Sequence, residues 1–359
     1  MKQYKIAIDD NILVKDKIYA AESGMLSNFK SPYSATVVEK MQKVGAELVS
    51  AQISGQTQGL PLHNEADVAL GIDVDGSAYR SAVKTNTIYI KPTYGTVSRF
   101  GVVANVSSVD QIGVYAKNFD DGFEVLSAIA GHDKNDGTSY PTEKYEYSPD
   151  KINKIDVKSL KAAKLNGFYG DSEEPFDERI NNIGIPVDSI DFKLADYLAQ
   201  VYLIISTAEF SNNISRFDGL KFGYRTENFR DLNDMITNSR SESFTAETKI
   251  KSLMGTYVLS EEQFKKYYYK ATQIRRLIKE ELDEIFKQYD FVITHISDFS
   301  DGSGFSDAKG YYNNLKFSAL ANLTGCPSIT VPVTNQHGVQ IIAREFDENK
   351  LYALGKSLL

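Results

Sequence analysis

The sequence contains a single cysteine, Cys326. One cysteine can form neither an internal disulfide nor a thiolate metal cluster, which fits a reducing compartment. Cys326 lies in the segment Thr-Gly-Cys-Pro, where we expect a small buried hydrophobe rather than a catalytic nucleophile. We therefore expect no metal site in this protein.

Long apolar runs are also missing. The first residues, Met1 to Ile6, contain no apolar stretch of the length that a signal peptide needs. The most apolar segment, Tyr197 to Ile205, is too short to span a bilayer. We therefore expect a soluble, cytoplasmic protein that does not enter a membrane.

No run of like charge is long enough to form a basic arm. The 40 lysines and arginines stand against 48 aspartates and glutamates, which gives a net charge of −8. Direct binding to DNA or RNA is therefore not expected. If a tRNA takes part in the function, we expect a partner subunit to hold it.

The chain does contain enough apolar residues for a large core, since 42% of its 359 residues are hydrophobic. No internal repeat, low-complexity tract or break in composition marks a linker. The most polar stretch, Glu143 to Val157, is interpreted as a surface loop. We therefore predict one domain over residues 1–359.

Residues 12–53 have the pattern of a β-strand, an α-helix and a second β-strand. Ile12-Leu13-Val14 predicts a short buried strand that ends at Lys15, and Glu47 to Ile53 predicts the second strand. Between them, Ser34 is the expected N-cap and Gly45 the expected stop of a helix with a periodic apolar face, formed by Val37, Val38, Met41 and Val44. This spacing indicates a βαβ unit, and hence an α/β protein with a parallel or mixed sheet.

Residues 54–80 are rich in glycine, serine, aspartate and glutamine and show little periodicity. We expect a loop region here. Loops on a rigid scaffold often carry the chemistry of a protein, so this segment is a candidate for the functional site.

The last hundred residues predict another alternation of helix and strand. Ser260 and Gln263 have the spacing of a capping box before a long helix, whose apolar face is formed by Phe264, Tyr267, Ala271, Ile274, Ile278 and Leu282. A strand is predicted at Asp290 to Thr294. Two late strands, Pro327 to Pro332 and Val339 to Ile342, are expected to be joined by a turn at His337-Gly338.

Three blocks occur in order in the middle of the chain: Lys91-Pro-Thr-Tyr-Gly-Thr-Val-Ser-Arg-Phe-Gly101, Ser107-Ser-Val-Asp-Gln-Ile-Gly113 and Gly131-His-Asp-Lys-Asn-Asp-Gly-Thr-Ser139. Taken alone, Asp110-Gln111 would cap a turn, and His132 and Asp133 would form a loop hydrogen-bond pair. Together the blocks resemble the amidase-signature family, and specifically its amidotransferase A subunits. Further matches between Ala208 and Pro327 extend the resemblance over most of the chain.

The resemblance implies a mixed central β-sheet surrounded by α-helices, which agrees with the α/β pattern. It also implies that the chain lacks the helices that usually precede the lysine strand and part of the Gly/Ser-rich loop region.

Members of this family cut amides with a serine nucleophile, a second serine that relays its proton, and a lysine as the final base. By resemblance, Ser77 matches the nucleophile and Lys15 the lysine. A lysine acts as a base only when burial brings its pKa well below about 10.4, and the buried strand expected before Lys15 would do this. An ungapped count places the relay serine on Ile53, so Ser54 takes that role only if the loop shifts by one residue.

The family forms its oxyanion hole from backbone N–H groups before the nucleophile, which correspond to Val74, Asp75 and Gly76. Asp75 stands where the family has a glycine, and a carboxylate directed inward would oppose a developing oxyanion. Arg240 matches the arginine that binds the carboxylate of glutamine. The usual acidic partner of the donor's amino group falls on Leu315, with Asn314 beside it.

The resemblance implies a glutamine amidohydrolase that supplies ammonia to a partner, which uses ATP to transamidate Glu-tRNA(Gln) or Asp-tRNA(Asn). The chain itself would need no cofactor, and amidotransferase subunits of the B and C type are the implied partners. Two alternatives remain open. One is a catalytically inactive relative that serves as a binding or scaffold subunit, and the other is a stand-alone amidase on another small amide.

Overall fold

A computed structural model describes residues 2–18, 23–53, 62, 65–141, 147, 152–168, 174–297, 308–334 and 337–358. For residues 50–53, 174, 175, 297, 308–311, 313 and 314 it describes the backbone.

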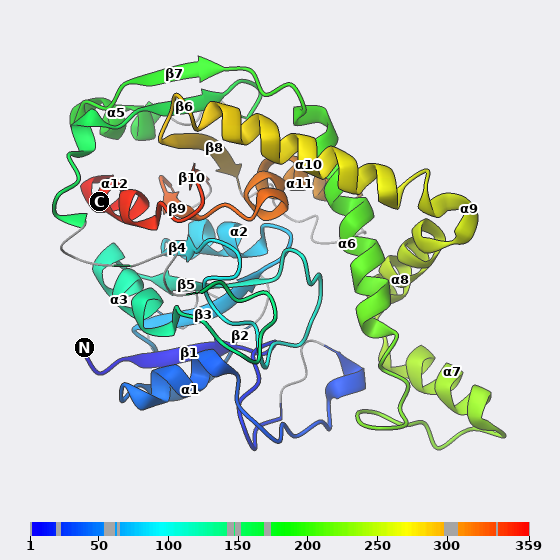
Figure 1. Cartoon of the computed structure of the whole chain (residues 1–359). Helices are drawn as coiled ribbons and strands as arrows, with labels where there is room; N and C mark the ends of the chain where they lie inside the picture. The colour runs from blue at the N-terminus through cyan, green and yellow to red at the C-terminus, as the bar shows by residue number, and fades with distance from the viewer. Residues whose placement is uncertain are drawn as a thin grey trace.

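The described strands form one ten-stranded sheet in the order β2-β1-β3-β5-β4-β9-β10-β8-β6-β7 (Figure 1). Their bounds are β1 (Lys5–Asp9), β2 (Glu47–Ile53), β3 (Val68–Asp73), β4 (Ile88–Lys91), β5 (Gln111–Ala116), β6 (Ala162–Leu165), β7 (Val187–Ile190), β8 (Phe291–Ser297), β9 (Ser328–Pro332) and β10 (His337–Ala343). β1 runs parallel to β2 and β3, and β6 runs parallel to β7 and β8. The central pairs are antiparallel, so the sheet is mixed, as predicted.

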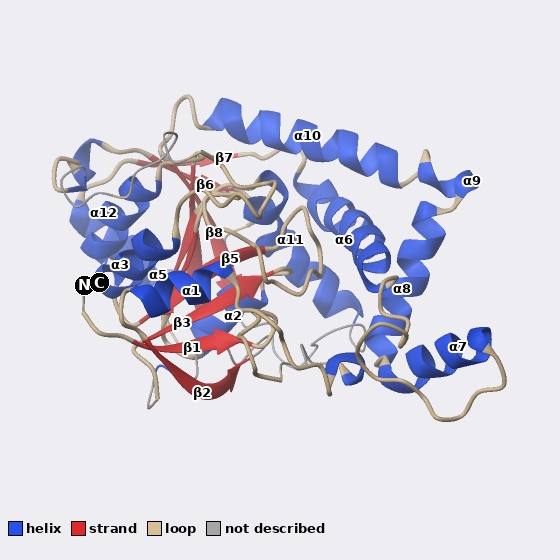
Figure 2. Ribbon diagram, turned by 60° about the horizontal axis from the view of Figure 1, so that its bottom comes forward, coloured by secondary structure: helices blue, strands red, loops and turns tan. Residues whose placement is uncertain are grey.

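Helices cover both faces of this sheet, with α1, α3 and α12 on one side and α2 and α11 on the other (Figure 2). The α-helices are α1 (Thr36–Lys43), α2 (Ser77–Lys84), α3 (Phe119–Ile129), α5 (Glu174–Ile183), α6 (Leu198–Ile214), α7 (Leu232–Ser243), α8 (Ala246–Leu259), α9 (Glu261–Phe264), α10 (Tyr268–Ile285), α11 (Ala308–Thr324) and α12 (Glu348–Leu358). Short 3-10 turns are η1 (Gly24–Leu26), η5 (Val157–Ser159) and η7 (Ala195–Tyr197). None of the described helices combines the length and the apolar composition needed to cross a membrane.

Strand β3 shows how the two faces are packed. Its large residues, Val68, Leu70 and Ile72, join the core cluster beneath α1, α3 and α12. Ala69 faces the opposite side and packs with Tyr79 of α2. All six residues of β3 are buried, so its sequence lacks the alternation of apolar and polar residues that marks a half-exposed strand. The loop predicted over residues 54–80 is therefore wrong for Val68–Asp73 and for the start of α2.

The predicted βαβ unit is confirmed as β1, α1 and β2, with β2 at the predicted bounds. The first strand, however, is Lys5–Asp9 and not residues 12–14. After Asp9 the chain turns, because Asp9 Oδ1 accepts hydrogen bonds from the backbone N–H and the side-chain amide of Asn11. Ile12 is buried and makes one isolated bridge to Val102.

Two predicted helix caps are wrong in detail. Ser34 does not cap α1, because the N-cap is Ala35 and the Ser34 hydroxyl accepts the backbone N–H of Lys15 at 2.9 Å. Gly45 follows α1 with a φ of +84°, as expected of a stop residue. The hydroxyl of Ser260 donates to the carbonyl of Tyr257 and does not close a capping box.

The C-terminal alternation of helix and strand is confirmed with small changes. The long helix is divided into α9 and α10, and its predicted residues Ala271, Ile278 and Leu282 are buried. The strands β8, β9 and β10 lie where they were predicted. His337 and Gly338 belong to β10 and do not form the turn. Cys326 is fully buried, as expected.

Helices α6 and α8 pack closely at a glycine. A Cβ atom at Gly255 would lie 2.0 Å from the carbonyl oxygen of Thr207 on α6. We expect Gly255→Ala to lower the free energy of unfolding by about 1–3 kcal/mol through overpacking, although alanine is the better helix former.

Urea unfolding followed by circular dichroism would measure this loss. Gly137→Ala is the matched control, because no atom lies within 4 Å of a Cβ atom there. Equal stability of the two variants would contradict the close packing of α6 and α8.

Candidate functional site

The segment around Ser77 is a tight turn between β3 and α2. β3 ends at Asp73, and Ser77 is the first residue of α2. Gly76, the N-cap residue, has a φ of +85°, and a Cβ atom on it would lie 2.2 Å from Cβ of Ser318. A glycine is therefore required at position 76, both for its backbone conformation and for the contact with α11.

Side chains from α6 and α11 fix the backbone of this turn. The amide of Asn322 donates to Asp73 Oδ2 at 2.6 Å and to the carbonyl of Val74 at 3.0 Å. The Ser318 hydroxyl donates to the carbonyl of Asp75 at 3.0 Å. The Tyr202 hydroxyl of α6 also donates to the carbonyl of Val74. The turn is thus held from two helices that lie far from it in the sequence.

The backbone N–H groups at the start of α2 already have acceptors within the protein. Gly76 N donates to Asp73 Oδ2 at 3.3 Å, and Ala78 N donates to Asp73 Oδ1 at 2.9 Å. Ser77 N donates to Asp75 Oδ1 at 3.1 Å. The predicted oxyanion-hole residues are Val74, Asp75 and Gly76. Of these, Gly76 has its backbone N–H bonded to the carboxylate of Asp73.

Asp75 pairs with the cation Arg80. Nη2 of Arg80 is 3.6 Å from Asp75 Oδ1, and Nη1 of Arg80 donates to the Asp75 carbonyl at 3.2 Å. Burial acts to raise the pKa of Asp75, but the charges of Arg80 and Lys251, with hydrogen bonds from Ser77, hold it below its usual value. Lys251 lies on α8, and no local sequence pattern points to its place beside this turn.

The two parallel strands β1 and β3 both end in a buried aspartate. Burial raises the pKa of Asp73 to about 6, although hydrogen bonds from Asn322 and Ala78 oppose the rise. Asp9 is fully buried, and burial raises its pKa to about 8. Its Oδ2 accepts the backbone N–H of Ile72 at 3.3 Å. The end of β1, which pairs with β3, therefore carries a protonated carboxyl group.

Lys15 is not at a strand end and is not buried. Its side chain is exposed to solvent in the turn that follows Val14. The buried strand expected directly before Lys15 is therefore wrong, because β1 ends at Asp9, and the catalytic role of Lys15 stays a prediction. Ser54 lies outside the described residues, and Ile53 is described by its backbone, so the relay serine stays a prediction.

Arg240 lies on α7, and Figures 1 and 2 both place this helix at the end of the molecule away from α2. Nη1 of Arg240 donates to the carbonyls of Ile214 and Phe217 at 2.9 and 2.8 Å. Its guanidinium lies 4.7 Å from the ring centre of Phe244. The described contacts of Arg240 thus hold the turn after α6, and its role in binding a substrate carboxylate stays a prediction.

Leu315 is buried in the core cluster that includes Val74, so α11 presents an apolar side chain to this part of the turn. The side chain of Asn314 lies outside the described residues. Its predicted role in substrate binding stays a prediction.

The block that begins at Lys91 joins β4 to the end of α11. Nζ of Lys91 donates to the carbonyls of Cys326 and Ala321 at 2.8 and 3.2 Å. Burial lowers the pKa of Lys91 to about 8. Lys91 thus positions the segment that carries Asn322, a role that local sequence patterns do not reveal.

The other two blocks form a hydrogen-bonded support for the sheet. Asp110 accepts the N–H groups of Asn105 and Val106, and Asp133 accepts the hydroxyls of Thr36 and Ser98. Asp110 therefore holds a turn, as expected when its block is taken alone, whereas the side chain of Asp133 bonds to Thr36 and Ser98 and not to His132 as expected.

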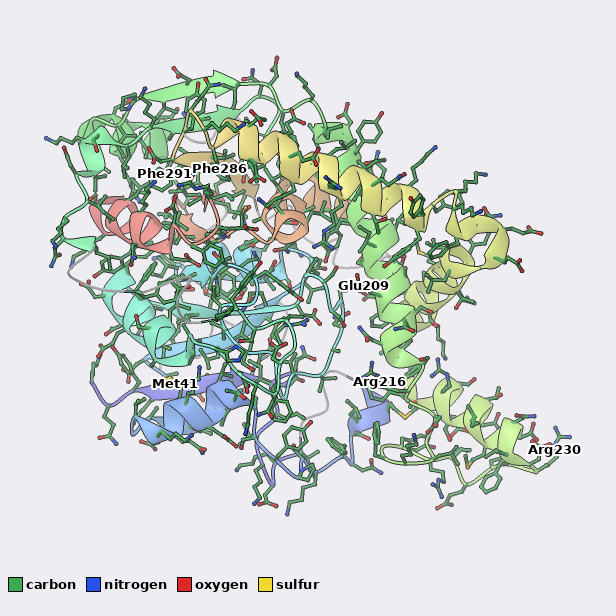
Figure 3. The ribbon with its side chains drawn as sticks, in the orientation of Figure 1. Met41, Glu209, Arg216, Arg230, Phe286 and Phe291 are labelled. Atoms are coloured by element: carbon green, nitrogen blue, oxygen red, sulfur yellow. The ribbon has the colours of Figure 1, made fainter. Side chains whose placement is uncertain are left out.

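Glu209, labelled on α6 in Figure 3, accepts the backbone N–H of Ser108 at 2.8 Å. Arg275 of α10 donates from Nη1 to the hydroxyl of Ser108 at 2.6 Å and from Nε to the carbonyl of Leu323. These hydrogen bonds connect Ser108 to α6 and α10. They also connect α10 to the end of α11.

Residues 63–352 match the family model described as Amidase. The chain belongs to the amidase family. Curated relatives include the A subunit of the glutamyl-tRNA(Gln) amidotransferase of Latilactobacillus sakei, 33% identical over 98% of this chain and 81% of the relative. The corresponding protein of Sulfolobus acidocaldarius is 32% identical over 98% of this chain and 84% of the relative.

Solved structures agree with this assignment to the amidase family. The crystal structure of the glutamyl-tRNA(Gln) amidotransferase A subunit from Thermotoga maritima superposes with a TM-score of 0.75 at 28% identity, covering 99% of this chain and 82% of the other. The native peptide amidase of Stenotrophomonas maltophilia has a TM-score of 0.77 at 20% identity, with 99% and 82% coverage, and shares the fold. The predicted α/β fold of the amidase-signature type is confirmed.

Proposed function

We propose that this chain is a non-catalytic member of the amidase family that works as a binding subunit. The observation that carries the proposal is the surroundings of Ser77. Within the described residues, no lysine or histidine makes a hydrogen bond to Ser77, and its backbone N–H is bonded to Asp75. Serine is a weak nucleophile unless a base removes its proton. Lys15, the base expected by resemblance, is exposed to solvent.

The partners that this proposal implies come from the relatives, which are named as the A subunits of glutamyl-tRNA(Gln) amidotransferases. We infer assembly with amidotransferase subunits of the B and C type in the cytoplasm. A tRNA would be held by such a partner and ATP would be used by it, while this chain would supply the amidase fold without a cofactor of its own.

Purified wild-type protein and Ser77→Ala, assayed for ammonia release from glutamine, test the proposal. We expect both proteins to give the same background rate, since no lysine or histidine in the part of the chain that the structure describes makes a hydrogen bond to Ser77. Exposed Ser241, on α7, provides the control variant Ser241→Ala. A wild-type rate well above that of Ser77→Ala, with Ser241→Ala equal to wild type, would contradict the proposal.

A working glutamine amidohydrolase is the second candidate. It is favoured by the place of Ser77, which is only partly buried at the start of α2 after a glycine turn. Labelling of Ser77 by a fluorophosphonate would support this candidate. The same assay with simple aliphatic amides would identify a stand-alone amidase, the third alternative.

A further inference from the structure

We propose that Asp75 is an internal ligand of the Ser77 turn, whose carboxylate occupies the position that an external carboxylate or amide oxygen would need. The inference rests on the proposed non-catalytic function and deepens it, because a turn that binds its own carboxylate is closed to a substrate. Four contacts of Asp75 support it, two through the carboxylate and two through the backbone.

The first support is the direct contact between Asp75 and the candidate nucleophile. Asp75 Oδ1 accepts the backbone N–H of Ser77 at 3.1 Å. The side chain of Asp75 keeps 23% of its surface exposed, so it lies at the entrance of the turn and not in the core. A group that approached Ser77 from solvent would meet this carboxylate.

The second support is the cation that faces Asp75 from α2. Arg80 of α2 is 13% exposed and lies 3.6 Å from the carboxylate. Lys251 of α8 is 23% exposed and forms its closest ion pair with Glu247 at 2.7 Å. The charge of Lys251 nevertheless contributes to holding the pKa of Asp75 low. A cation with as little exposure as Arg80 is costly to leave without an anion beside it.

The third support is that hydrogen bonds hold the backbone of Asp75 in the turn. The carbonyl of Asp75 accepts hydrogen bonds from Nη1 of Arg80 at 3.2 Å and from the Ser318 hydroxyl at 3.0 Å. A rotation of the residue out of the turn would break both bonds. The backbone that carries the carboxylate is therefore fixed in the turn, and the carboxylate itself is held by Ser77 N and Arg80.

The chemistry of this arrangement defines what could replace the side chain. Arg80 and the N–H of Ser77 converge on one carboxylate, and the charge of Lys251 favours its ionised form. In Asp75→Ala the same groups would face a gap the size of a carboxylate. We therefore expect the variant to take up a small monocarboxylate such as acetate, which the wild type excludes.

The test compares the thermal unfolding of wild-type protein and Asp75→Ala in sodium acetate and in sodium chloride at equal ionic strength. We expect acetate to raise the midpoint of Asp75→Ala above its value in chloride and to leave the wild type unaffected. If Asp75→Ala is unfolded in chloride, recovery of its helical circular dichroism in acetate gives the same answer. Equal behaviour in the two salts would overturn the proposal.

Two further variants separate charge from shape. In Asp75→Ala/Arg80→Gln we expect the acetate effect to disappear, and its persistence would refute the role of Arg80. Asp75→Asn keeps the shape of the side chain without its charge, so at low salt its midpoint of thermal unfolding should lie below that of the wild type. The difference between the two midpoints should become smaller as sodium chloride screens the charges. A midpoint equal to wild type at low salt would count against the ion pairs. These experiments measure stability and not hydrolysis. The proposal for Asp75 can therefore fail while the proposed absence of catalysis still holds.

Discussion

Asn322→Leu is expected to lower the free energy of unfolding by about 3–6 kcal/mol, since it removes three buried hydrogen bonds, each worth about 0.5–1.5 kcal/mol, or about 1.5–3 kcal/mol where one partner is charged. The substitution removes the 2.6 Å hydrogen bond to Asp73 and the 3.0 Å bond to the carbonyl of Val74. It also removes the acceptor of the Tyr79 hydroxyl. Asp73, Tyr79 and Asn322 are all buried, so water cannot replace the lost bonds.

Urea unfolding at neutral pH, followed by far-ultraviolet circular dichroism, would measure the loss. Asn182→Leu is the matched control, because Asn182 is exposed on α5. Surface substitutions of this kind usually change stability by less than about 0.5 kcal/mol. If Asn322→Leu were as stable as Asn182→Leu, α11 would not be what holds the Ser77 turn.

Asp9→Asn is expected to become more stable relative to the wild type as the pH rises. Burial raises the pKa of Asp9 from 3.8 to about 8 in the folded protein. A carboxyl whose folded pKa is raised contributes stability that is fully present below its unfolded pKa and is lost as the pH rises through the folded pKa. The wild type therefore loses this contribution between about pH 4 and pH 8, while the asparagine variant does not titrate.

The expected change in the stability difference between pH 5 and pH 8 is on the order of 3 kcal/mol, from about 1.4 kcal/mol for each pKa unit. Asparagine imitates the protonated acid, since it can still accept the N–H of Asn11. Asp196→Asn is the control, because the side chain of Asp196 is 92% exposed. A stability difference between Asp9→Asn and wild type that does not change with pH would show that Asp9 is not protonated in the folded state.

Much of the fold could be predicted from local patterns. Helix α1 has its apolar residues on one face and a glycine stop, and strand β2 follows at the predicted bounds. The late strands β8, β9 and β10 are short apolar runs between turn residues, and they too are confirmed. These elements could be predicted because each of them has a pattern that is complete within about ten residues.

Other elements could not be predicted in this way. Strand β3 is buried on both faces and therefore lacks alternation. The end of β1 was misplaced because Ile12, Leu13 and Val14 are buried without belonging to a strand. Burial of an apolar run is thus a weaker signal of a strand than its pairing with neighbours, and pairing is not visible in one segment of sequence.

The candidate site could likewise be predicted only in part. Ser77 and the glycine turn before it could be located by resemblance, and the structure places both at the junction of β3 and α2. The exposed position of Lys15 and the distance of α7 from α2 could not be foreseen, because both depend on how the chain folds back on the sheet.

The sequence by itself determined the amidase family and the α/β class, because matched blocks and hydrophobic periods are properties of short segments. Only the tertiary structure decided which groups meet at Ser77. Asn322 reaches Asp73 across 249 positions of the chain, and Lys251 acts on Asp75 from a separate helix. Such contacts set the charge and the hydrogen bonding of the turn. They exist only once the sheet and its covering helices have brought distant residues together.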